Sequence, residues 1–365
     1  MKRRSFIKKS VVAGAAATVA AASTLAAPAI AQGKRELKMV TSWPKNLPGL
    51  GTSAQWAADR ITQLSGGRLT VKLYAAGELV PPFGTFDAVS QGNADMQHSA
   101  SFLYGGKAAA LNFFSTVPFG LTSSELIAWM EFGGGDALFD EVCAPFGIKP
   151  FLSGVPDYTF MGWLNKEINT LDDLKGLKYR MPGVGGEALK RLGVSVVNMP
   201  AGELLQALQS GAIDGTEWGG PYLDLGMGFH KVTKFYYYPG FHEPGTGVDI
   251  SVNLKLWNSL SKDDQELIAV VSKAATMRCL AECTAGNGKA IGTLVKQHNV
   301  KLRRVPDEIL KAIGKHVNDA LEEMGNKDPL TKKVYDSFKA FRAEMHVSAQ
   351  IGNESYLAAR RLALG

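Results

Sequence analysis

Arg180 stands where a predicted strand meets a glycine-rich turn, and this position suits an anion-binding side chain. Apolar and basic residues alternate over 177–181, and Pro182 and a cluster of glycines follow before a helical pattern at 187–192. The alternation places Arg180 on the face opposite the apolar side chains. Open α/β sheets bind ligands at the carboxyl ends of their strands, and a planar guanidinium matches a carboxylate in bidentate fashion. The pattern is equally consistent with a carboxylate-binding arginine and with a surface arginine paired with a nearby acid.

Glu217 and Glu243 both lie in segments rich in glycine and proline that we expect to line a cleft. Glu217 follows a short strand and precedes Trp218, and Glu243 falls within 239–245, a loop that we expect to cross between two lobes. Two carboxylates could hold a hard cation such as Na⁺ or Ca²⁺, which takes oxygen ligands. They could instead form a general acid/base pair, or each could pair with a surface lysine. Trp218 would cover a ligand or fill the core.

The first 31 residues predict an export signal. Adjacent arginines at Arg3 and Arg4 precede an apolar, alanine-rich stretch at 11–27, and small residues at Ala29 and Ala31 form a cleavage site. This pattern favours the twin-arginine route to the periplasm over a membrane anchor. The segment carries five basic residues and no acid, so the formal net charge of +6 falls to +1 in the mature chain. The basic composition therefore does not indicate nucleic-acid binding.

Strands and helices alternate along the mature chain, which predicts βαβ units and α/β lobes with mixed, mostly parallel sheets. The pattern A-x-x-x-G-x-x-D occurs twice, at 88–95 and at 207–214, and in both places a helix ends at glycine before a short strand. This repeat suggests two lobes of similar architecture. A cleft between two lobes is a preferred small-molecule site, and hinge closure around a ligand is the expected motion.

The expected domains follow from this alternation. We assign 32–156 to the first lobe, 157–245 to the second lobe, 246–328 to crossing segments and helices that complete both lobes, and 329–365 to a long C-terminal helix. That helix carries apolar residues at heptad-like spacing, namely Val334, Phe338, Phe341 and Met345. The stripe either packs on the chain's own lobes or meets a second subunit.

An ordered set of motifs resembles one family. It comprises Pro118–Gly120, Gly162–Trp163, Leu171–Arg180, Leu208–Gly215 and Glu217–Trp218. These motifs are similar to those of the periplasmic solute-binding proteins of tripartite ATP-independent (TRAP) transporters, over nearly the whole mature chain. The α-keto acid-binding branch is the most similar, because it has the Glu-Trp pair and the later His-Glu-Pro-Gly, here at 242–245.

The resemblance implies roles for individual residues. Arg180 would clamp the substrate carboxylate, and Glu217, Trp218 (through its main-chain carbonyl) and Glu243 would surround a cation, Na⁺ or Ca²⁺, that bridges to the substrate. The branch contacts substrate with aromatic residues after a first-lobe strand, which indicates Phe102, Leu103 and Tyr104 here. The branch also has a glutamine cation ligand four residues before the tryptophan of the Gly-Trp block, and Thr159 stands at that position.

The implied function is capture of a small organic acid, a 2-oxo or 2-hydroxy monocarboxylate, for delivery to the membrane subunits of the transporter. The branch includes dimers that exchange the terminal helix, which implies a homodimer. The alternative is an exported lyase or hydrolase that uses Glu217 and Glu243 as acid and base. No nucleophile–base pair is visible, and His242 is the histidine that we expect near the site.

Overall fold

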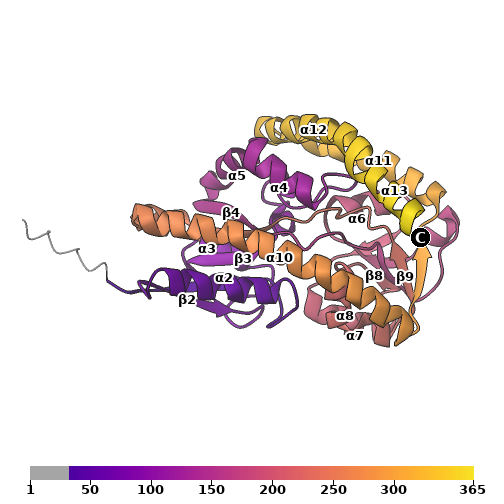
Figure 1. Cartoon of the computed structure of the whole chain (residues 1–365), viewed down its shortest axis with the longest axis horizontal. Helices are drawn as coiled ribbons and strands as arrows, with labels where there is room; N and C mark the ends of the chain where they lie inside the picture. The colour runs from indigo at the N-terminus through magenta and orange to yellow at the C-terminus, as the bar shows by residue number, and fades with distance from the viewer. Residues whose placement is uncertain (1–32) are drawn as a thin grey trace, which may run out of the picture. The chain divides into compact units, whose positions relative to one another are not determined.

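The computed structural model describes residues 33–365, which fold around two mixed β-sheets flanked by helices (Figure 1). The predicted export signal at 1–31 lies outside the described residues. The strand order is β2-β1-β3-β10-β4 in the first sheet and β11-β9-β5-β8-β6-β7 in the second. The predicted two-lobed α/β architecture is therefore confirmed. Within residues 33–365, no helix combines the length and apolar character needed to cross a membrane.

The first sheet is completed by a strand from the second half of the chain. β1 pairs in parallel with β3, and β10 lies antiparallel between β3 and β4. The chain therefore returns to the first sheet after building most of the second. The strands are β1 (Arg35–Thr41), β2 (Leu69–Tyr74), β3 (Met96–Ser99), β4 (Ile148–Gly154) and β10 (Val248–Asn253), and the helices are α2 (Gly51–Leu64), α3 (Thr85–Ser90), α4 (Ser123–Phe132), α5 (Gly135–Cys143) and α9 (Leu254–Ser259).

The second sheet has parallel and antiparallel parts. β6 pairs in parallel with β7 and β8, and β5 pairs antiparallel with β8 and β9. Its strands are β5 (Gly162–Leu164), β6 (Lys178–Arg180), β7 (Ser195–Val197), β8 (Gly215–Thr216), β9 (Phe235–Tyr238) and β11 (Lys301–Arg304), and its helices are α6 (Gly183–Lys190), α7 (Ala201–Ser210) and α8 (Pro221–Met227).

The repeated A-x-x-x-G-x-x-D pattern has the same structural role in both sheets. Its glycine has a positive φ in each copy, 78° and 72°, which favours glycine where a helix ends. In the first copy, the Asp95 carboxylate accepts a hydrogen bond from the Lys38 main-chain N–H at 2.8 Å. In the second copy, Asp214 and Lys178 form the same contact at 2.8 Å. Each aspartate therefore fixes the strand after the helix against its parallel neighbour.

Helix α10 (Lys262–Lys296) packs on both lobes. Its N-terminus is capped by Ser261, which accepts a hydrogen bond from the Asp264 N–H at 3.1 Å. The helix contacts β4 of the first sheet and α8 beside the second (Figure 1). Where it passes α8, Gly286 lies so close to the Tyr222 ring that a Cβ atom would come within 2.4 Å. α10 is therefore a single continuous element shared by both lobes.

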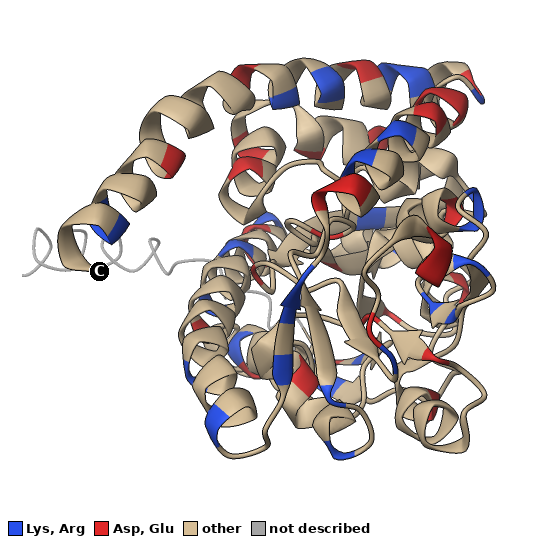
Figure 2. Cartoon of the chain, turned by 90° about the vertical axis from the view of Figure 1, so that its right-hand side faces the viewer, with Lys and Arg blue, Asp and Glu red and all other residues tan. Residues whose placement is uncertain are grey.

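The C-terminal segment differs from the single helix that we predicted. α12 (Pro329–Ala349) passes into a π-helical turn (Gln350–Glu354) and then into α13 (Ser355–Leu364), and α11 (Asp307–Gly325) precedes them. Val334 and Phe338 are buried in the chain's own core, where Phe338 meets the Trp129 ring edge-on at 5.4 Å. The apolar stripe of α12 therefore packs on its own lobes. Figure 2 shows α13 extending past the elements that α12 covers.

Asp224, on α8, is a buried carboxylate that ties together parts of the second lobe. It accepts hydrogen bonds from the Gly219 main-chain N–H at 3.0 Å, the Trp163 indole at 2.9 Å and the Tyr236 hydroxyl at 2.7 Å. Burial raises its pKa to about 8, against the opposing effect of the bonds from Tyr236 and Trp163. Because Gly219 closes the turn that follows β8, Asp224 holds that turn in place.

Replacing Asp224 with asparagine should flatten the pH dependence of stability. The folded pKa of about 8 lies above the ordinary value of 3.8, so the folded state holds this proton more tightly than the unfolded state. The free energy of unfolding therefore falls as the pH rises through that window. We expect the stability difference between wild type and Asp224→Asn, measured by urea unfolding, to shrink by about 1 kcal/mol or more from pH 5 to pH 8. Exposed Asp172→Asn is the control, and parallel pH curves for wild type and Asp224→Asn would contradict this expectation.

Candidate functional site

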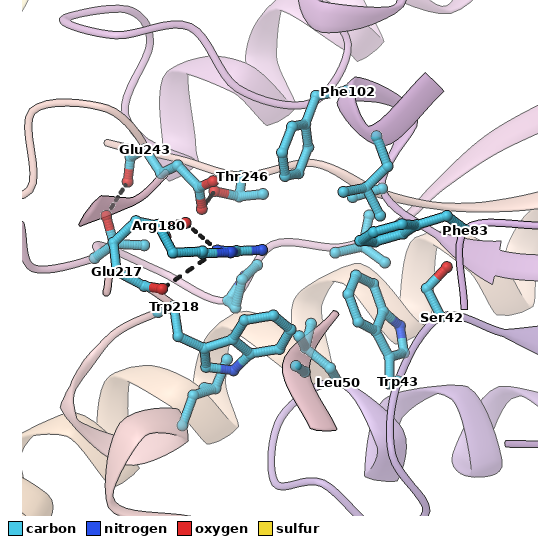
Figure 3. Close-up of a pocket in the computed structure, with 18 residues that line it drawn as sticks. Ser42, Trp43, Leu50, Phe83, Phe102, Arg180, Glu217, Trp218, Glu243 and Thr246 are labelled. Atoms are coloured by element: carbon cyan, nitrogen blue, oxygen red, sulfur yellow. Dashed lines mark hydrogen bonds and ion pairs between the residues drawn. The ribbon is translucent and has the colours of Figure 1, made fainter. Parts of the chain in front are cut away.

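A pocket lies where the carboxyl ends of strands from both sheets meet the crossing segments (Figure 3). Ser42 and Trp43 follow β1, Arg180 ends β6, and Glu217 follows β8. This sheet edge is the one at which α/β proteins bind their ligands. The pocket therefore occupies the position that the sequence predicted for Arg180.

The pocket has a polar end and an apolar end. The polar end is formed by Arg180, Glu217, Glu243, Thr246 and Thr159. The apolar lining comes from Trp43, Leu50, Phe83, Ala100, Phe102, Leu103, Leu223 and Val248. In Figure 3, Ser42 and Phe83 lie on the far side of the pocket from the two glutamates. The arrangement suits a small ligand with a charged head and a less polar tail.

Arg180 is almost fully buried, with 3% of its surface exposed. Its Nη1 donates to the Glu217 carboxylate and, at 3.2 Å, to the Glu217 main-chain carbonyl, while Nε donates to the Met199 carbonyl at 3.4 Å. Cζ lies 5.5 Å from the centre of the Trp218 ring, a cation–π contact. Nη2 makes no hydrogen bond to a described residue, and the guanidinium points into the pocket (Figure 3). The guanidinium that we expected to meet a ligand carboxylate is therefore partly occupied by Glu217 and Met199.

Glu217 is a buried carboxylate between a guanidinium and an imidazole. One oxygen accepts from Arg180, and Oε2 lies 3.1 Å from His242 Nε2. Burial acts to raise the pKa of Glu217, but Arg180 and His242 outweigh it, so the pKa lies below its ordinary value. Glu217 is therefore ionised, and His242 is at the site, as we expected.

Glu243 lies beside Glu217 and His242, and its carboxylate has fewer hydrogen-bond partners than that of Glu217. Its Oε2 accepts a hydrogen bond from the Thr246 hydroxyl at 2.9 Å. Burial raises the pKa of Glu243 to about 7, and the negative charge of Glu217 adds to the increase. Glu217, Glu243 and His242 each offer a ligand atom within 4.8 Å of the others. The two carboxylates supply the oxygen ligands that a hard cation prefers.

Thr159 and Trp218 both line the pocket, and each also contacts another residue of the protein. The Thr159 hydroxyl donates to the Glu243 main-chain carbonyl at 2.9 Å, so it holds the segment that carries Glu243. The Trp218 ring meets the Trp43 ring edge-on at 6.3 Å, and its indole N–H has no hydrogen-bond partner among the described residues. The two indoles therefore form one aromatic wall.

Of the three first-lobe residues that we expected to contact substrate, two line the pocket and one does not. Phe102 and Leu103 line the pocket. Tyr104 does not, because its hydroxyl turns into the first lobe and lies 2.8 Å from the Ser99 hydroxyl. All three belong to one 3₁₀ turn (Ser101–Tyr104), whose side chains point in different directions. We therefore leave Tyr104 out of the ligand shell.

Sequence reasoning missed several pocket residues, chiefly Trp43, Phe83 and Thr246. Trp43 carried a usable signal, because it follows a predicted strand and so lies at the ligand edge of the first sheet. Its indole donates to His98 Nδ1 at 2.9 Å, which fixes the ring in the pocket wall. Phe83 and Thr246 come from connecting segments and carried no comparable signal.

Comparison with known proteins agrees with this geometry. The chain matches the family described as bacterial extracellular solute-binding protein, family 7, over residues 39–328. A monocarboxylate 2-oxoacid-binding periplasmic protein of Nostoc sp. is 38% identical over 358 residues, which cover 98% of each chain.

Two solved structures share the fold. A TRAP periplasmic solute-binding protein from Pseudoalteromonas atlantica, with bound sodium and pyruvate, is 38% identical, with a TM-score of 0.86 over 89% of this chain and 99% of that one. A TRAP transporter solute-binding protein from Bordetella bronchiseptica, a mixed-occupancy dimer with copurified calcium and picolinate, is 32% identical. Its TM-score is 0.88, over 91% of this chain and 98% of that one.

These matches confirm the predicted resemblance, and they agree with the predicted periplasmic location. The expected cation is present in both relatives, as sodium in one and as calcium in the other. The alternative of an exported lyase or hydrolase acting through Glu217 and Glu243 is wrong, because the family consists of binding proteins. The chain belongs to the bacterial extracellular solute-binding proteins of family 7, the group that serves TRAP transporters.

Proposed function

We propose that this chain captures a small 2-oxo or 2-hydroxy monocarboxylate in the periplasm and delivers it to the membrane subunits of a TRAP transporter. The observation that carries the proposal is a buried arginine with one free nitrogen facing the pocket, beside two buried carboxylates. The names of the relatives, which bind 2-oxo acids or pyruvate, support the same ligand class.

In this proposal, Arg180 Nη2 meets the ligand carboxylate. Nε and Nη1 are already bonded, so a ligand either uses Nη2 alone or takes Nη1 by displacing Glu217. A charge-assisted hydrogen bond of this kind contributes about 1.5–3 kcal/mol. The ligand tail then extends toward Phe102, Leu103 and the aromatic wall of Trp43 and Trp218.

The residues at the polar end fit a hard cation. Glu217 and Glu243 would hold it through carboxylate oxygens, and the Trp218 carbonyl and Thr159 remain proposed ligands. When bound, the cation would offset the charge of Glu243 and polarise the 2-oxo or 2-hydroxy oxygen of the ligand. His242 keeps Glu217 oriented through its Nε2 contact. Sodium and calcium in the relatives support this assignment.

We also propose a homodimer built by the C-terminal segment. After α12, apolar side chains remain exposed where the chain's own core does not cover them, namely Val347, Ile351, Tyr356, Leu357, Leu362 and Leu364. Exposed apolar patches of this kind mark protein contacts. The dimeric form of the Bordetella bronchiseptica relative supports a second copy of this chain as the partner.

Arg180→Lys should abolish most ligand binding while keeping a positive charge beside Glu217. Pyruvate at about a hundred times its Kd should stabilise wild type by about 2.7 kcal/mol in thermal unfolding. Lysine lacks the fork geometry, so we expect the affinity to fall about tenfold or more. Arg191→Lys, at a surface arginine that pairs with Glu323, is the matched control. Equal pyruvate affinity in Arg180→Lys and wild type would contradict the proposed role of Arg180 in binding the ligand carboxylate.

Glu243→Gln should remove the cation dependence of binding. After chelation and transfer to a choline buffer, we expect Ca²⁺ or Na⁺ to raise the pyruvate affinity of wild type about tenfold or more. The variant should lack this response, because it has lost a buried carboxylate ligand of the cation. Titration calorimetry with each cation, together with tryptophan fluorescence from the pocket wall, measures the effect. Exposed Glu187→Gln is the control. A cation response that survives in Glu243→Gln would remove this residue from the site.

The double variant Leu362→Asp and Leu364→Asp should be monomeric, because charges on this exposed apolar segment oppose its burial. We expect wild type to sediment as a dimer over a concentration series. Phe132→Asp is a matched control on α4, since Phe132 is also apolar and is 91% exposed. A monomeric wild type, or a double variant that stays dimeric, would exclude this interface.

A further inference from the structure

The ligand pocket shares part of its wall with a second and larger cavity, which we call the outer chamber. The outer chamber lies among the 3₁₀ turn that carries Phe102, the start of α6 and the end of α11. The space open to the centre of a water-sized sphere is about 460 Å³ in the outer chamber and about 40 Å³ in the ligand pocket. Phe102 and Leu103 line both cavities, so they form the partition between them.

Much of the remaining apolar wall of the pocket is backed by packed core. Four of its side chains belong to one buried cluster and are at most 5% exposed, namely Trp43, Leu50, Leu223 and Val248. A ligand tail that pressed on these residues would have to displace core side chains, which is costly. Leu103 packs against this cluster and against the largest core cluster as well. Phe102 packs on the same wall cluster and has open space behind it, so the partition is one side chain thick at Phe102.

Phe102 closes the gap between the two lobes at this point. It comes from the turn after β3 in the first lobe, and its ring points into the pocket in Figure 3. Gly183, the first residue of α6 in the second lobe, has a φ of 67°, and a Cβ atom there would lie 3.4 Å from Phe102 Cδ2. The ring therefore lies against the main chain of the opposite lobe.

The same ring borders a small cavity behind the charged end of the pocket. Glu243 and His242 also line this cavity, whose volume of about 10 Å³ is room for about one water molecule. Phe102 therefore separates the ligand pocket from two other spaces. Its removal would let water approach the charged groups as well as joining the pocket to the outer chamber.

We propose that Phe102 sets the upper limit on the length of the acid that this chain binds. The ring stops the ligand tail at the partition, so short 2-oxo acids are selected over long ones although a chamber large enough for a longer tail lies directly behind. This inference rests on the proposed function, and it narrows the ligand class within it. Phe102 is thus a specificity-determining residue that acts by its size.

The outer chamber offers an alkyl tail an apolar surface once the partition is gone. Pro182, Val184, Ala320 and Met324 contribute to its lining, together with charged residues nearer its rim such as Arg191 and Glu323, which pair at 2.7 Å. Each methylene group that leaves water strengthens binding roughly fourfold. A tail that enters the chamber by two or more carbons therefore gains about tenfold or more in affinity.

A series of 2-oxo acids of increasing length tests the proposal. The probes are pyruvate, 2-oxobutanoate, 2-oxohexanoate and 2-oxooctanoate, measured by titration calorimetry in one sodium-containing buffer. The readout is the ratio of association constants for 2-oxooctanoate and 2-oxobutanoate. In wild type we expect this ratio to be about one tenth or less, because the long tail meets the ring and the packed wall.

In Phe102→Ala the ratio should rise about tenfold or more, and in Phe102→Leu it should rise less. Pyruvate should bind Phe102→Ala a few-fold more weakly, since water then competes for the charged groups. Thermal unfolding without ligand checks that each variant is folded. If Phe102→Ala does not fold, the milder Phe102→Leu carries the test, and a ratio equal to that of wild type overturns the proposal.

Two further variants show where the long tail goes. Phe83→Ala removes another phenyl group from the pocket lining, but Phe83 does not line the outer chamber, so the ratio should not rise. Adding Val184→Trp to Phe102→Ala refills the chamber beside the lost ring, and the ratio should return toward the wild-type value. An equal rise in Phe83→Ala, or no return in the double variant, would contradict the partition.

The outcomes separate this inference from the proposed function. If wild type binds none of the 2-oxo acids, the proposed function fails and the inference fails with it. If wild type binds the short acids but binds 2-oxooctanoate equally well, or if Phe102→Ala keeps the wild-type ratio, the proposed function stands and the role of Phe102 is overturned.

Discussion

A guanidinium and two carboxylates share one space that is almost closed to water, and the rest of the site is arranged around their charges. Moving charges out of water costs several kcal/mol per ion unless partners compensate. Arg180 and Glu217 compensate each other, and Met199, His242 and the Trp218 ring complete their surroundings. The groups left with the fewest protein partners are Arg180 Nη2 and the Glu243 carboxylate. Both lie at the pocket, so the site is prepared for an anion and a cation together.

The two sheets present these groups through similar local geometry. In each sheet a helix ends at a glycine, and an aspartate then pins the next strand to its parallel neighbour. The pinned neighbours, β1 and β6, lead to Trp43 and to Arg180 respectively. One lobe therefore supplies much of the apolar wall and the other supplies the charged end. A ligand has to contact both lobes to place its head at the charged end and its tail at the apolar wall.

Local patterns predicted the parts of the site that depend on local structure. Arg180 could be found because alternation, a strand end and a glycine turn all mark one position, and Glu217 was marked by a strand end in the same way. The contact between Glu217 and His242 joins residues 25 apart in the sequence, and no local pattern reports it. Tyr104 follows Phe102 and Leu103 directly, yet its hydroxyl turns toward Ser99 in the first lobe, because direction within one 3₁₀ turn depends on tertiary packing. The spacing of Val334 and Phe338 predicted an apolar stripe, but spacing alone does not say which surface covers it.

Helix α10 has a mechanical consequence for ligand capture. One continuous helix of 35 residues touches both β4 and α8, so the two lobes are tied to the same element. An opening motion that separates the lobes has to change one of these two contacts or bend the helix, and the contact with α8 is close, since Gly286 leaves no room for a side chain beneath the Tyr222 ring. Opening and closing of the cleft are therefore expected to be coupled to the packing of α10 against both lobes.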